Sequence, residues 1–211
     1  MEIVDHKVIF RGFEEYLPTF NACAIESMTW RIPGLQDRYL EFNDDVMLCA
    51  PVTPGDFITD DGKSVCYADK ANIPMIRFTR FMKKIFGSKK SVTFKGILAN
   101  SAILAGNRWS MLRINHNPRA LRREFYEQYF AEHPQTLIRN LRYRFRDSDM
   151  YLPELLQYTI LNNQGLCDVR PVKGNLMYIQ PKDRKDYIKE KLHRLESGNY
   201  RFCCFNSIES M

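Results

Sequence analysis

A short apolar segment that ends in adjacent carboxylates constrains this chain more than any other feature. Residues 38–42 have the aromatic and aliphatic content of a strand, and Asn43, Asp44 and Asp45 follow directly. Two neighbouring buried carboxylates repel each other and lose hydration, so a positive group would stabilise them. Mg²⁺ is usually held by one or two carboxylates together with substrate phosphates. The pattern predicts a metal–phosphate site at Asp44 and Asp45. The alternative is an ordinary turn, which Asn and Asp also favour.

Length and charge set the broad class of the protein. With 211 residues the chain is long enough for one domain, or one and a half, with a substantial core. The net charge of +6 suits an anionic ligand such as a nucleotide, an acidic polymer or a membrane surface. A generally basic surface explains the same charge, so the charge does not choose among these partners.

Neither a membrane span nor a disulfide framework is expected. No stretch of sequence reaches the roughly 18 apolar residues that cross a bilayer, and the first residues lack the pattern of a signal peptide. No two cysteines form a Cys-x-x-Cys pair or another paired metal-ligand spacing. Reduced, mostly buried thiols in a cytosolic chain are the expectation. The six cysteines are Cys23, Cys49, Cys66, Cys167, Cys203 and Cys204.

Periodicity and turn residues predict more helices than strands. The predicted strands cover 2–10, 38–42, 175–179 and 200–205. The predicted helices cover 22–32, 71–86, 92–105, 119–130, 151–161 and 183–195. The helix over 71–86 has a basic face, formed by Arg77, Arg80, Lys83 and Lys84. The pattern favours an α/β or α+β fold, and the expected class is α/β, with a mixed sheet of few strands and many helices.

Several motifs occur in order near the start of the chain. They are Leu17-Pro-Thr-Phe-Asn-Ala-Cys-Ala-Ile-Glu26, Arg31-Ile-Pro-Gly-Leu35, Phe42-Asn-Asp-Asp-Val46 and Phe57-Ile-Thr-Asp-Asp-Gly-Lys63. Together they resemble the second conserved region of the Stealth proteins. The family comprises sugar-1-phosphate transferases of bacterial capsule synthesis, and it is similar to the animal enzyme that places N-acetylglucosamine-1-phosphate on lysosomal glycoproteins.

Weaker matches extend the resemblance to about residues 3–206. His116-Asn-Pro-Arg119 and Tyr143-Arg-Phe-Arg-Asp147 resemble the third conserved region, and Phe202-Cys-Cys-Phe-Asn206 partly matches the fourth. The resemblance implies one Stealth-type catalytic domain, with the second region in 1–70, the third in 92–165 and a partial fourth in 175–211. It also implies a fold like that of nucleotide-sugar transferases.

Two departures from the family pattern bear on these expectations. The first conserved region, which helps to form the nucleotide site, has no counterpart here, so the N-terminal part of the fold is expected to be absent and the domain truncated. In addition, Ser207 stands where the family has an acidic residue. A fragment, a split gene product or a decayed copy would each explain the pattern.

The resemblance implies transfer of a hexose-1-phosphate from a nucleotide sugar to a sugar hydroxyl. Phosphoryl transfer requires mainly positioning and neutralisation of charge. Asp44 and Asp45 would hold Mg²⁺ or Mn²⁺ against the diphosphate, and Asn43 would orient one carboxylate or touch the sugar. Arg144 and Arg146 would clamp phosphate oxygens, with a solvated helix face as the alternative.

The other site residues implied by the resemblance concern the sugars. His116 is the candidate general base for the acceptor hydroxyl, because histidine titrates near pH 6.5, although a lone histidine is more often structural. Asn21 and Glu26 would line the sugar pocket, or else serve as a helix cap and a surface charge. Asn100 and Asn206 are further candidates for the substrate pocket.

The expected partners are a nucleotide-sugar donor and a saccharide acceptor, in the cytoplasm or at the inner face of the membrane. Contact with the membrane surface or with a polysaccharide-assembly partner is compatible with this function. A non-catalytic or complementing fragment is the first alternative, motivated by the missing region and by Ser207. A basic nucleic-acid-binding module is a weaker alternative, because the sequence carries no nucleic-acid signature and no nucleic acid is expected.

Overall fold

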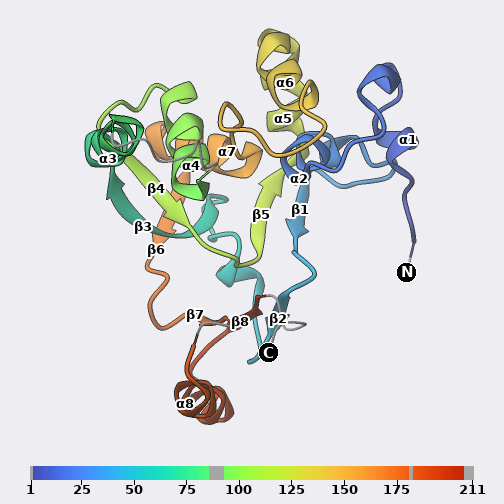
Figure 1. The fold of residues 1–211 in the computed structure, drawn as a ribbon. Coiled ribbons are helices and arrows are strands. Elements are labelled where there is room, and N and C mark those ends of the chain that lie inside the picture. The colour runs from blue at the N-terminus through green and yellow to red at the C-terminus, as the bar shows by residue number, and fades with distance from the viewer. Residues whose placement is uncertain (1, 86–92, 181–182, 207–211) are drawn as a thin grey trace. The chain divides into compact units, whose positions relative to one another are not determined.

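The computed structural model describes residues 2–85, 93–180 and 183–206, and Figure 1 shows their fold. The described helices are α1 (His6–Ile9), α2 (Ala22–Glu26), α3 (Ile73–Ile85), α4 (Phe94–Leu104), α5 (Arg123–Glu132), α6 (Pro134–Leu141), α7 (Pro153–Asn163) and α8 (Lys185–Glu196). The strands are β1 (Arg38–Glu41), β2 (Val46–Leu48), β3 (Ser64–Asn72), β4 (Ser110–Ile114), β5 (Arg119–Arg122), β6 (Cys167–Arg170), β7 (Leu176–Ile179) and β8 (Phe202–Phe205). These elements confirm the predicted α/β class.

The strands form three small sheets instead of one. Their orders are β1-β5, β2-β8-β7 and β4-β3-β6. In the second sheet β8 is antiparallel to β2 and parallel to β7, and in the third β3 is parallel to β6. The second sheet is therefore mixed, as expected, and all three sheets are small.

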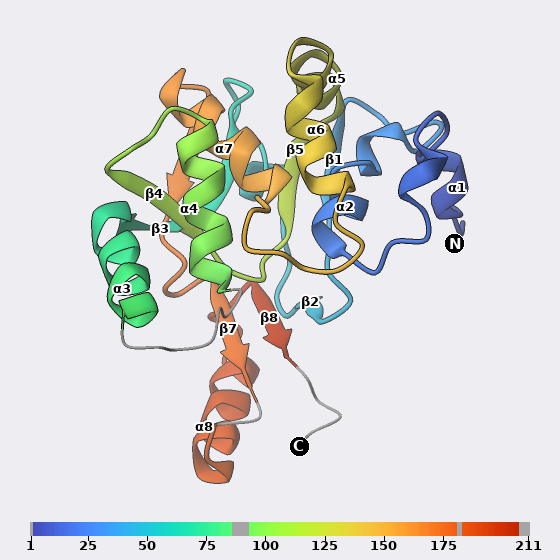
Figure 2. The ribbon, with the colours of Figure 1, turned by 45° about the horizontal axis from the view of Figure 1, so that its top comes forward.

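The chain divides into two compact units. Unit 1 comprises Met1–Tyr39, Lys70–Leu112 and Leu121–Ile160, and unit 2 comprises Leu40–Asp69, Arg113–Ala120 and Leu161–Met211. Unit 1 holds most of the helices, and α6 packs against both α2 and α5. In unit 2, α8 packs on β7, as Figures 1 and 2 both show.

The sheet β2-β8-β7 separates two apolar clusters in unit 2. On one face Phe202 and Cys204 belong to a buried cluster that also contains Phe57 and Tyr67. On the other face Cys203 packs with residues of β7 and α8. The alternation of side chains along a strand explains why the adjacent residues Cys203 and Cys204 face opposite sides.

The prediction of a strand over 2–10 was wrong. Asp5 accepts a hydrogen bond from the backbone nitrogen of Lys7 at 2.7 Å and caps helix α1. Ile9 and Phe10 are buried, whereas Ile3 is 85% exposed. A local cap therefore outweighs the loose apolar alternation on which the strand prediction rested.

The prediction of a helix over 119–130 was wrong at its start. Residues 119–122 form β5, and helix α5 begins at Arg123. Arg119, Ala120 and Leu121 are all buried, and β5 pairs with β1. Three consecutive buried residues carry no helical period, so tertiary pairing decided the conformation.

The sequence prediction missed strands β2, β3, β4 and β6, and for β3 the reason is related. Ser64 to Ala68 are all buried, so the first half of β3 lacks the alternation that marks a half-buried strand. The helix predicted over 71–86 begins at Ile73, because β3 continues to Asn72 and the Asn72 side chain accepts from the backbone nitrogen of Met75 at 3.1 Å.

The other predicted elements agree with the structure to within a few residues, except over 22–32. There, α2 ends at Glu26 and a short 3₁₀ turn follows at Thr29–Arg31.

The predicted basic face of the helix over 71–86 is described in part. Arg77 is exposed. The side chains of Arg80, Lys83 and Lys84 lie outside the described residues, and so does Phe86. Within the described ranges, no helix combines the length and the apolar character that crossing a membrane requires.

Candidate functional site

Strand pairing in unit 2 brings the acidic segment before β2 next to the carboxyl end of β8. Val46 pairs with Cys204, and Cys204 pairs with Tyr178 on the other side. The residues beyond these pairs meet as well, because the backbone nitrogen of Phe205 donates to the carbonyl of Asp45 at 2.9 Å. The acidic segment before β2 therefore lies at the carboxyl end of β8, where ligand sites are common in α/β folds.

Asp45 and His116 form the centre of this site. Nδ1 of His116 lies 3.3 Å from Oδ2 of Asp45, and their side chains are 34% and 19% exposed. The other oxygen of Asp45, Oδ1, is buried and has no hydrogen-bond partner among the described residues. A carboxylate at this distance from Nδ1 orients the imidazole ring.

Cys204 adds a thiol to the same cluster. Its Sγ lies 3.3 Å from Oδ2 of Asp45 and donates to it. Burial, followed by the contact with Asp45, raises the pKa of the Cys204 thiol well above its ordinary value. The thiol is therefore protonated at neutral pH and is a hydrogen-bond donor, not a nucleophile.

Tyr178 and Asn206 line the side of the cluster formed by β7 and β8. The Asn206 amide donates to the hydroxyl of Tyr178, and the Asn206 backbone nitrogen donates to the carbonyl of Ile179 at 3.0 Å. The ring of Tyr178 lies 5.8 Å, between centroids, from that of His116. Burial raises the pKa of Tyr178, so its hydroxyl stays protonated over the physiological range.

Asn43 is held by a buried arginine. Nη1 of Arg119 donates to Oδ1 of Asn43 at 3.0 Å and to Oε1 of Glu41 at 2.9 Å. Arg119 is only 5% exposed, so this charge is compensated by the Glu41 carboxylate and not by solvent. The Asn43 carbonyl accepts from the backbone nitrogen of Val46 at 3.1 Å, which closes the turn that carries the two aspartates.

The two aspartates that were predicted to act as a pair differ in burial, and their joint role stays a prediction. Asp45 joins the cluster of His116 and Cys204, whereas Asp44 is exposed. Mg²⁺ needs only one or two protein carboxylates when phosphates complete its coordination. The buried, unpartnered Oδ1 of Asp45 fits a cation at this position. The residues present are therefore compatible with Mg²⁺ at Asp45, with Asp44 as a candidate outer ligand.

In unit 1, two predicted site residues hold the loop between α6 and α7. Nδ2 of Asn21 donates to the carbonyl of Tyr143 at 3.0 Å, near the start of the loop. Nδ2 of Asn100 donates to the carbonyls of Ser148 at 2.9 Å and Met150 at 2.6 Å, near its end. The side chain of Asn21 also caps α2, as the sequence predicted. Both amides thus bind backbone, and the sugar-pocket role expected of them stays a prediction.

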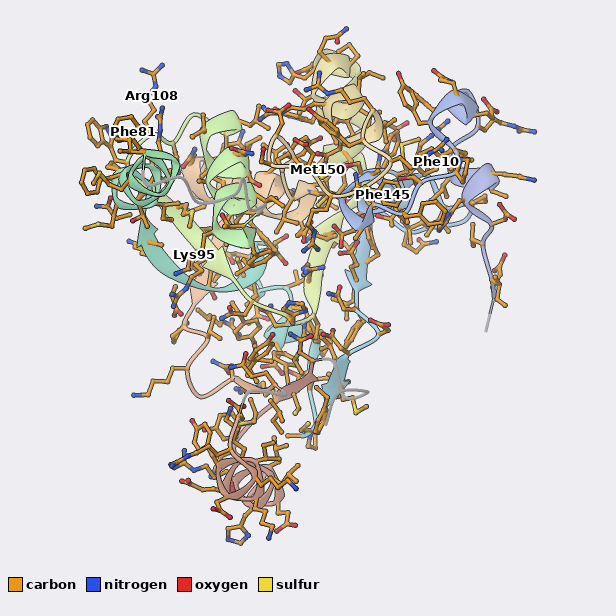
Figure 3. All side chains as sticks on the ribbon, viewed as in Figure 1. Phe10, Phe81, Lys95, Arg108, Phe145 and Met150 are labelled. Carbon is orange, nitrogen blue, oxygen red and sulfur yellow. The ribbon has the colours of Figure 1, made fainter. Side chains whose placement is uncertain are left out.

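The loop held by these amides carries Arg144 and Arg146, both exposed. Phe145 between them, labelled in Figure 3, stacks on Phe20 with 5.5 Å between ring centroids, while Met150 is completely buried. The two arginines therefore lie on an anchored loop beyond the end of α6, and not on a solvated helix face. Glu26, the last residue of α2, is half-buried, and its predicted sugar contact is untested.

Sequence reasoning missed Cys204, Tyr178 and Arg119 as members of the site. Cys204 lies two residues before Asn206 in the predicted last strand, so alternation along that strand could have placed both side chains on one face. The pairing with β7 that brings in Tyr178 depends on register, which the sequence does not show. Ser207, which departs from the family pattern, lies outside the described residues.

Comparison with known proteins identifies a family segment in the first third of the chain. Residues 1–66 match the family model described as Stealth protein CR2, conserved region 2. This segment includes Asn21, Glu26 and the turn from Asn43 to Asp45. The class is thus that of proteins with a Stealth conserved region.

The relatives are phosphotransferases of bacterial polysaccharides. An exopolysaccharide phosphotransferase of Streptomyces coelicolor is 31% identical over 161 residues, which cover 75% of this chain and 26% of the relative. The receptor polysaccharide phosphotransferase of Streptococcus oralis is 50% identical over 60 residues, 28% of this chain and 18% of the relative. A capsular polysaccharide phosphotransferase of Streptococcus pneumoniae is 48% identical over 60 residues, with the same shares.

Through residues 1–66 the chain shares the second conserved region of the Stealth proteins. It spans about a quarter of the length of the first Streptomyces relatives that it matches, at 26% and 25%.

Proposed function

We propose that this chain transfers a hexose-1-phosphate from a nucleotide sugar to a sugar hydroxyl in the synthesis of capsular or extracellular polysaccharide. The observation that carries the proposal is the cluster of Asp45, His116, Tyr178 and Asn206 at one end of the sheet β2-β8-β7. The names of the relatives support sugar-phosphate transfer in polysaccharide synthesis. The nucleotide-sugar donor and the saccharide acceptor are part of the proposal, as is action at the cytoplasmic face of the membrane.

In this mechanism His116 is the general base. Its Nδ1 faces Asp45 at 3.3 Å, so a ring that carries its proton on Nδ1 presents the lone pair of Nε2 to the acceptor hydroxyl. The proton moves from the hydroxyl to Nε2 as the hydroxyl oxygen attacks phosphorus and the nucleoside monophosphate leaves. The Asp45 carboxylate then stabilises the imidazolium, as in other carboxylate–histidine pairs.

Charge on the diphosphate must be neutralised by cations. Mg²⁺ or Mn²⁺ held by Asp45, with Asp44 outside it, would supply this neutralisation when bound. Arg144 and Arg146 are proposed phosphate clamps, with Asn21 and Asn100 positioning their loop through its backbone carbonyls. Arg119 positions Asn43, and we propose that Asn43 and Asn206 contact the sugar.

The first test is calorimetric titration with UDP-N-acetylhexosamine, and with GDP and CMP sugars beside it, with and without Mg²⁺. We expect binding that depends on metal and falls at least about tenfold in Asp45→Ala, because one charge-assisted contact contributes about 1.5–3 kcal/mol. Asp60→Ala is the control, since Asp60 is an exposed carboxylate of the same unit. Equal binding by wild type and Asp45→Ala would refute the assignment of the donor site.

The second test concerns His116 and uses turnover. With the saccharide acceptor present, His116→Ala should lower kcat by about 10²–10⁴-fold while donor affinity stays within about twofold, because a general base acts only in the transition state. Full activity in His116→Ala would contradict the mechanism. Metal-dependent binding without any turnover by the wild type would favour the non-catalytic alternative, which the departure at Ser207 motivates.

A further inference from the structure

Three different donor atoms meet at the candidate site. Oδ2 of Asp45 lies 3.3 Å from Nδ1 of His116 and 3.3 Å from Sγ of Cys204. One ligand atom from each of the three side chains lies within 4.8 Å of a ligand atom of the other two. They come from three separate segments of unit 2: the turn before β2, the turn between β4 and β5, and strand β8.

The spacing of these atoms matches tetrahedral coordination. Zinc bonds of about 2.3 Å to sulfur and about 2.0–2.1 Å to nitrogen and oxygen place neighbouring ligand atoms about 3.3–3.6 Å apart. The two separations of 3.3 Å lie at the lower end of this range, and the third pair of ligand atoms lies within 4.8 Å. Small side-chain movements would bring the three ligand atoms to zinc-binding distances.

The chemistry of the donors favours a softer metal than Mg²⁺. Mg²⁺ selects oxygen ligands in octahedral geometry, whereas thiolate and imidazole ligands select zinc and related transition metals. The Asp45 carboxylate, whose buried Oδ1 has no hydrogen-bond partner within the described part of the chain, carries one negative charge that a dication would compensate. Cys204 is completely buried, while His116 and Asp45 are partly exposed and provide the path of entry.

We propose that Asp45, His116 and Cys204 form a three-ligand zinc site with an open fourth position, and that zinc bound there inhibits the transfer reaction. Binding would replace the thiol proton by the metal and release that proton to solvent. With zinc on Nδ1, the ring proton of His116 must lie on Nε2, so this nitrogen can no longer accept a proton from a hydroxyl. The inhibitory part of the proposal rests on the proposed function, but the metal site does not.

The site is tested first by metal binding in the absence of substrate. Co²⁺ added to the intact, reduced chain should give one equivalent of a tetrahedral complex with a near-ultraviolet thiolate–cobalt charge-transfer band, and Zn²⁺ should displace it. Cys204→Ser should abolish the charge-transfer band, and His116→Asn should weaken Co²⁺ binding at least about tenfold. Circular dichroism of each variant verifies that it is folded.

Cys203→Ser is the matched control. Cys203 is the neighbouring thiol on the same strand, is equally buried, and faces the cluster with α8 instead of Asp45. We expect it to keep the cobalt band. A band that is absent from the wild type, or that persists in Cys204→Ser, would overturn the site.

Inhibition is measured separately from binding. At fixed Mg²⁺, Zn²⁺ should inhibit transfer by the wild type and by Cys203→Ser. Its half-inhibiting concentration, with each rate expressed relative to the zinc-free rate of the same variant, should rise at least about tenfold in Cys204→Ser. Unchanged zinc sensitivity in Cys204→Ser would refute the inhibitory role. A cobalt complex in a chain without turnover would support the metal site and count against the proposed function instead.

Discussion

At the scale of single residues, the buried amide side chain of Asn140 fixes how several segments of unit 1 pack. Asn140 is completely buried, and its Nδ2 donates to the Ser27 hydroxyl at 2.9 Å and to the carbonyl of Tyr151 at 3.0 Å. Its Oδ1 accepts from the backbone nitrogen of Tyr151 at 3.2 Å. One side chain thus links α2, α6 and the segment that leads into α7. A buried polar group in this position specifies one packing of the helices, because any other packing leaves it unpaired.

This role predicts a large loss of stability when the amide is removed. Asn140→Leu should lower the free energy of unfolding by about 3 kcal/mol, because the backbone groups of Tyr151 lose their partners and Leu fits the polar site poorly. Urea denaturation followed by circular dichroism measures the change. Asn162→Ala, at an exposed position of α7, is the control and should stay within about 0.5 kcal/mol of the wild type. A loss of less than about 1 kcal/mol for Asn140→Leu would contradict the organising role.

At the scale of elements, a buried lysine contributes to holding α8 on its sheet, beside the apolar contacts of the helix. Lys191 is 8% exposed; its Nζ donates to Oδ2 of Asp183 at 2.6 Å and to the carbonyl of Tyr178 at 2.7 Å. Tyr178 belongs to β7 and contributes its ring to the candidate site. The position of β7 beside His116 therefore depends partly on the docking of a charged helix (Figure 2).

The ion pair of α8 predicts a dependence of stability on pH. Lys191, followed by the backbone of Gln180, holds the pKa of Asp183 below its ordinary value. A carboxyl whose pKa is lower in the folded state stabilises the fold above its ordinary pKa of about 3.9, and this contribution is lost as the pH falls through the lowered value. Asp183→Asn should therefore be less stable than the wild type at pH 7, and the difference should shrink as the pH approaches 3.

Chemical denaturation at a series of pH values checks this expectation. Asp60→Asn, at an exposed carboxyl, should follow the wild type at every pH. A difference between Asp183→Asn and wild type that stayed constant between pH 7 and pH 3 would show that the ion pair is not its cause.

At the scale of the whole molecule, the chain passes repeatedly between its two compact units. The passages lie inside β1, β3, β4, β5 and α7, where the ranges of the two units meet. Because each passage is part of a regular element, no Pro- or Gly-rich linker marks it. This explains why the sequence predicted one domain, and why composition alone could not show the division.

The thiols give a prediction for the molecule as a whole. All six cysteines are reduced thiols, and four of them, Cys23, Cys66, Cys203 and Cys204, are buried. Burial raises the pKa of Cys203 to about 12 and that of Cys66 well above the ordinary value. Alkylation at pH 8 should therefore modify Cys49 and Cys167 first, and the four buried thiols only in denaturant.

Mass spectrometry of the alkylated protein, before and after addition of denaturant, measures the order of reaction. The denatured sample is the internal control, because all six thiols should react there at similar rates. Native labelling of Cys204 as fast as that of Cys49 would contradict the buried position of β8.

Local features of this chain were readable from the sequence because they depend on neighbouring residues. The cap at Asn21, the strand before Asn43 and the helices α4, α7 and α8 follow from periodicity and from nearby polar groups, and the structure confirms them. The motif resemblance likewise identified the family, since the matched segment is short and contiguous.

Tertiary structure decided which predicted residues meet. Asp45 and His116 are 71 positions apart in the sequence and come together at 3.3 Å, while the adjacent Asp44 remains exposed. Cys204 joins them only because β8 pairs with β2 in one particular register, and a shift by one residue would turn its thiol to the opposite face. Register and long-range pairing depend on the burial of the whole unit, so a single sequence does not reveal them, and the thiol beside Asp45 was found only in the folded chain.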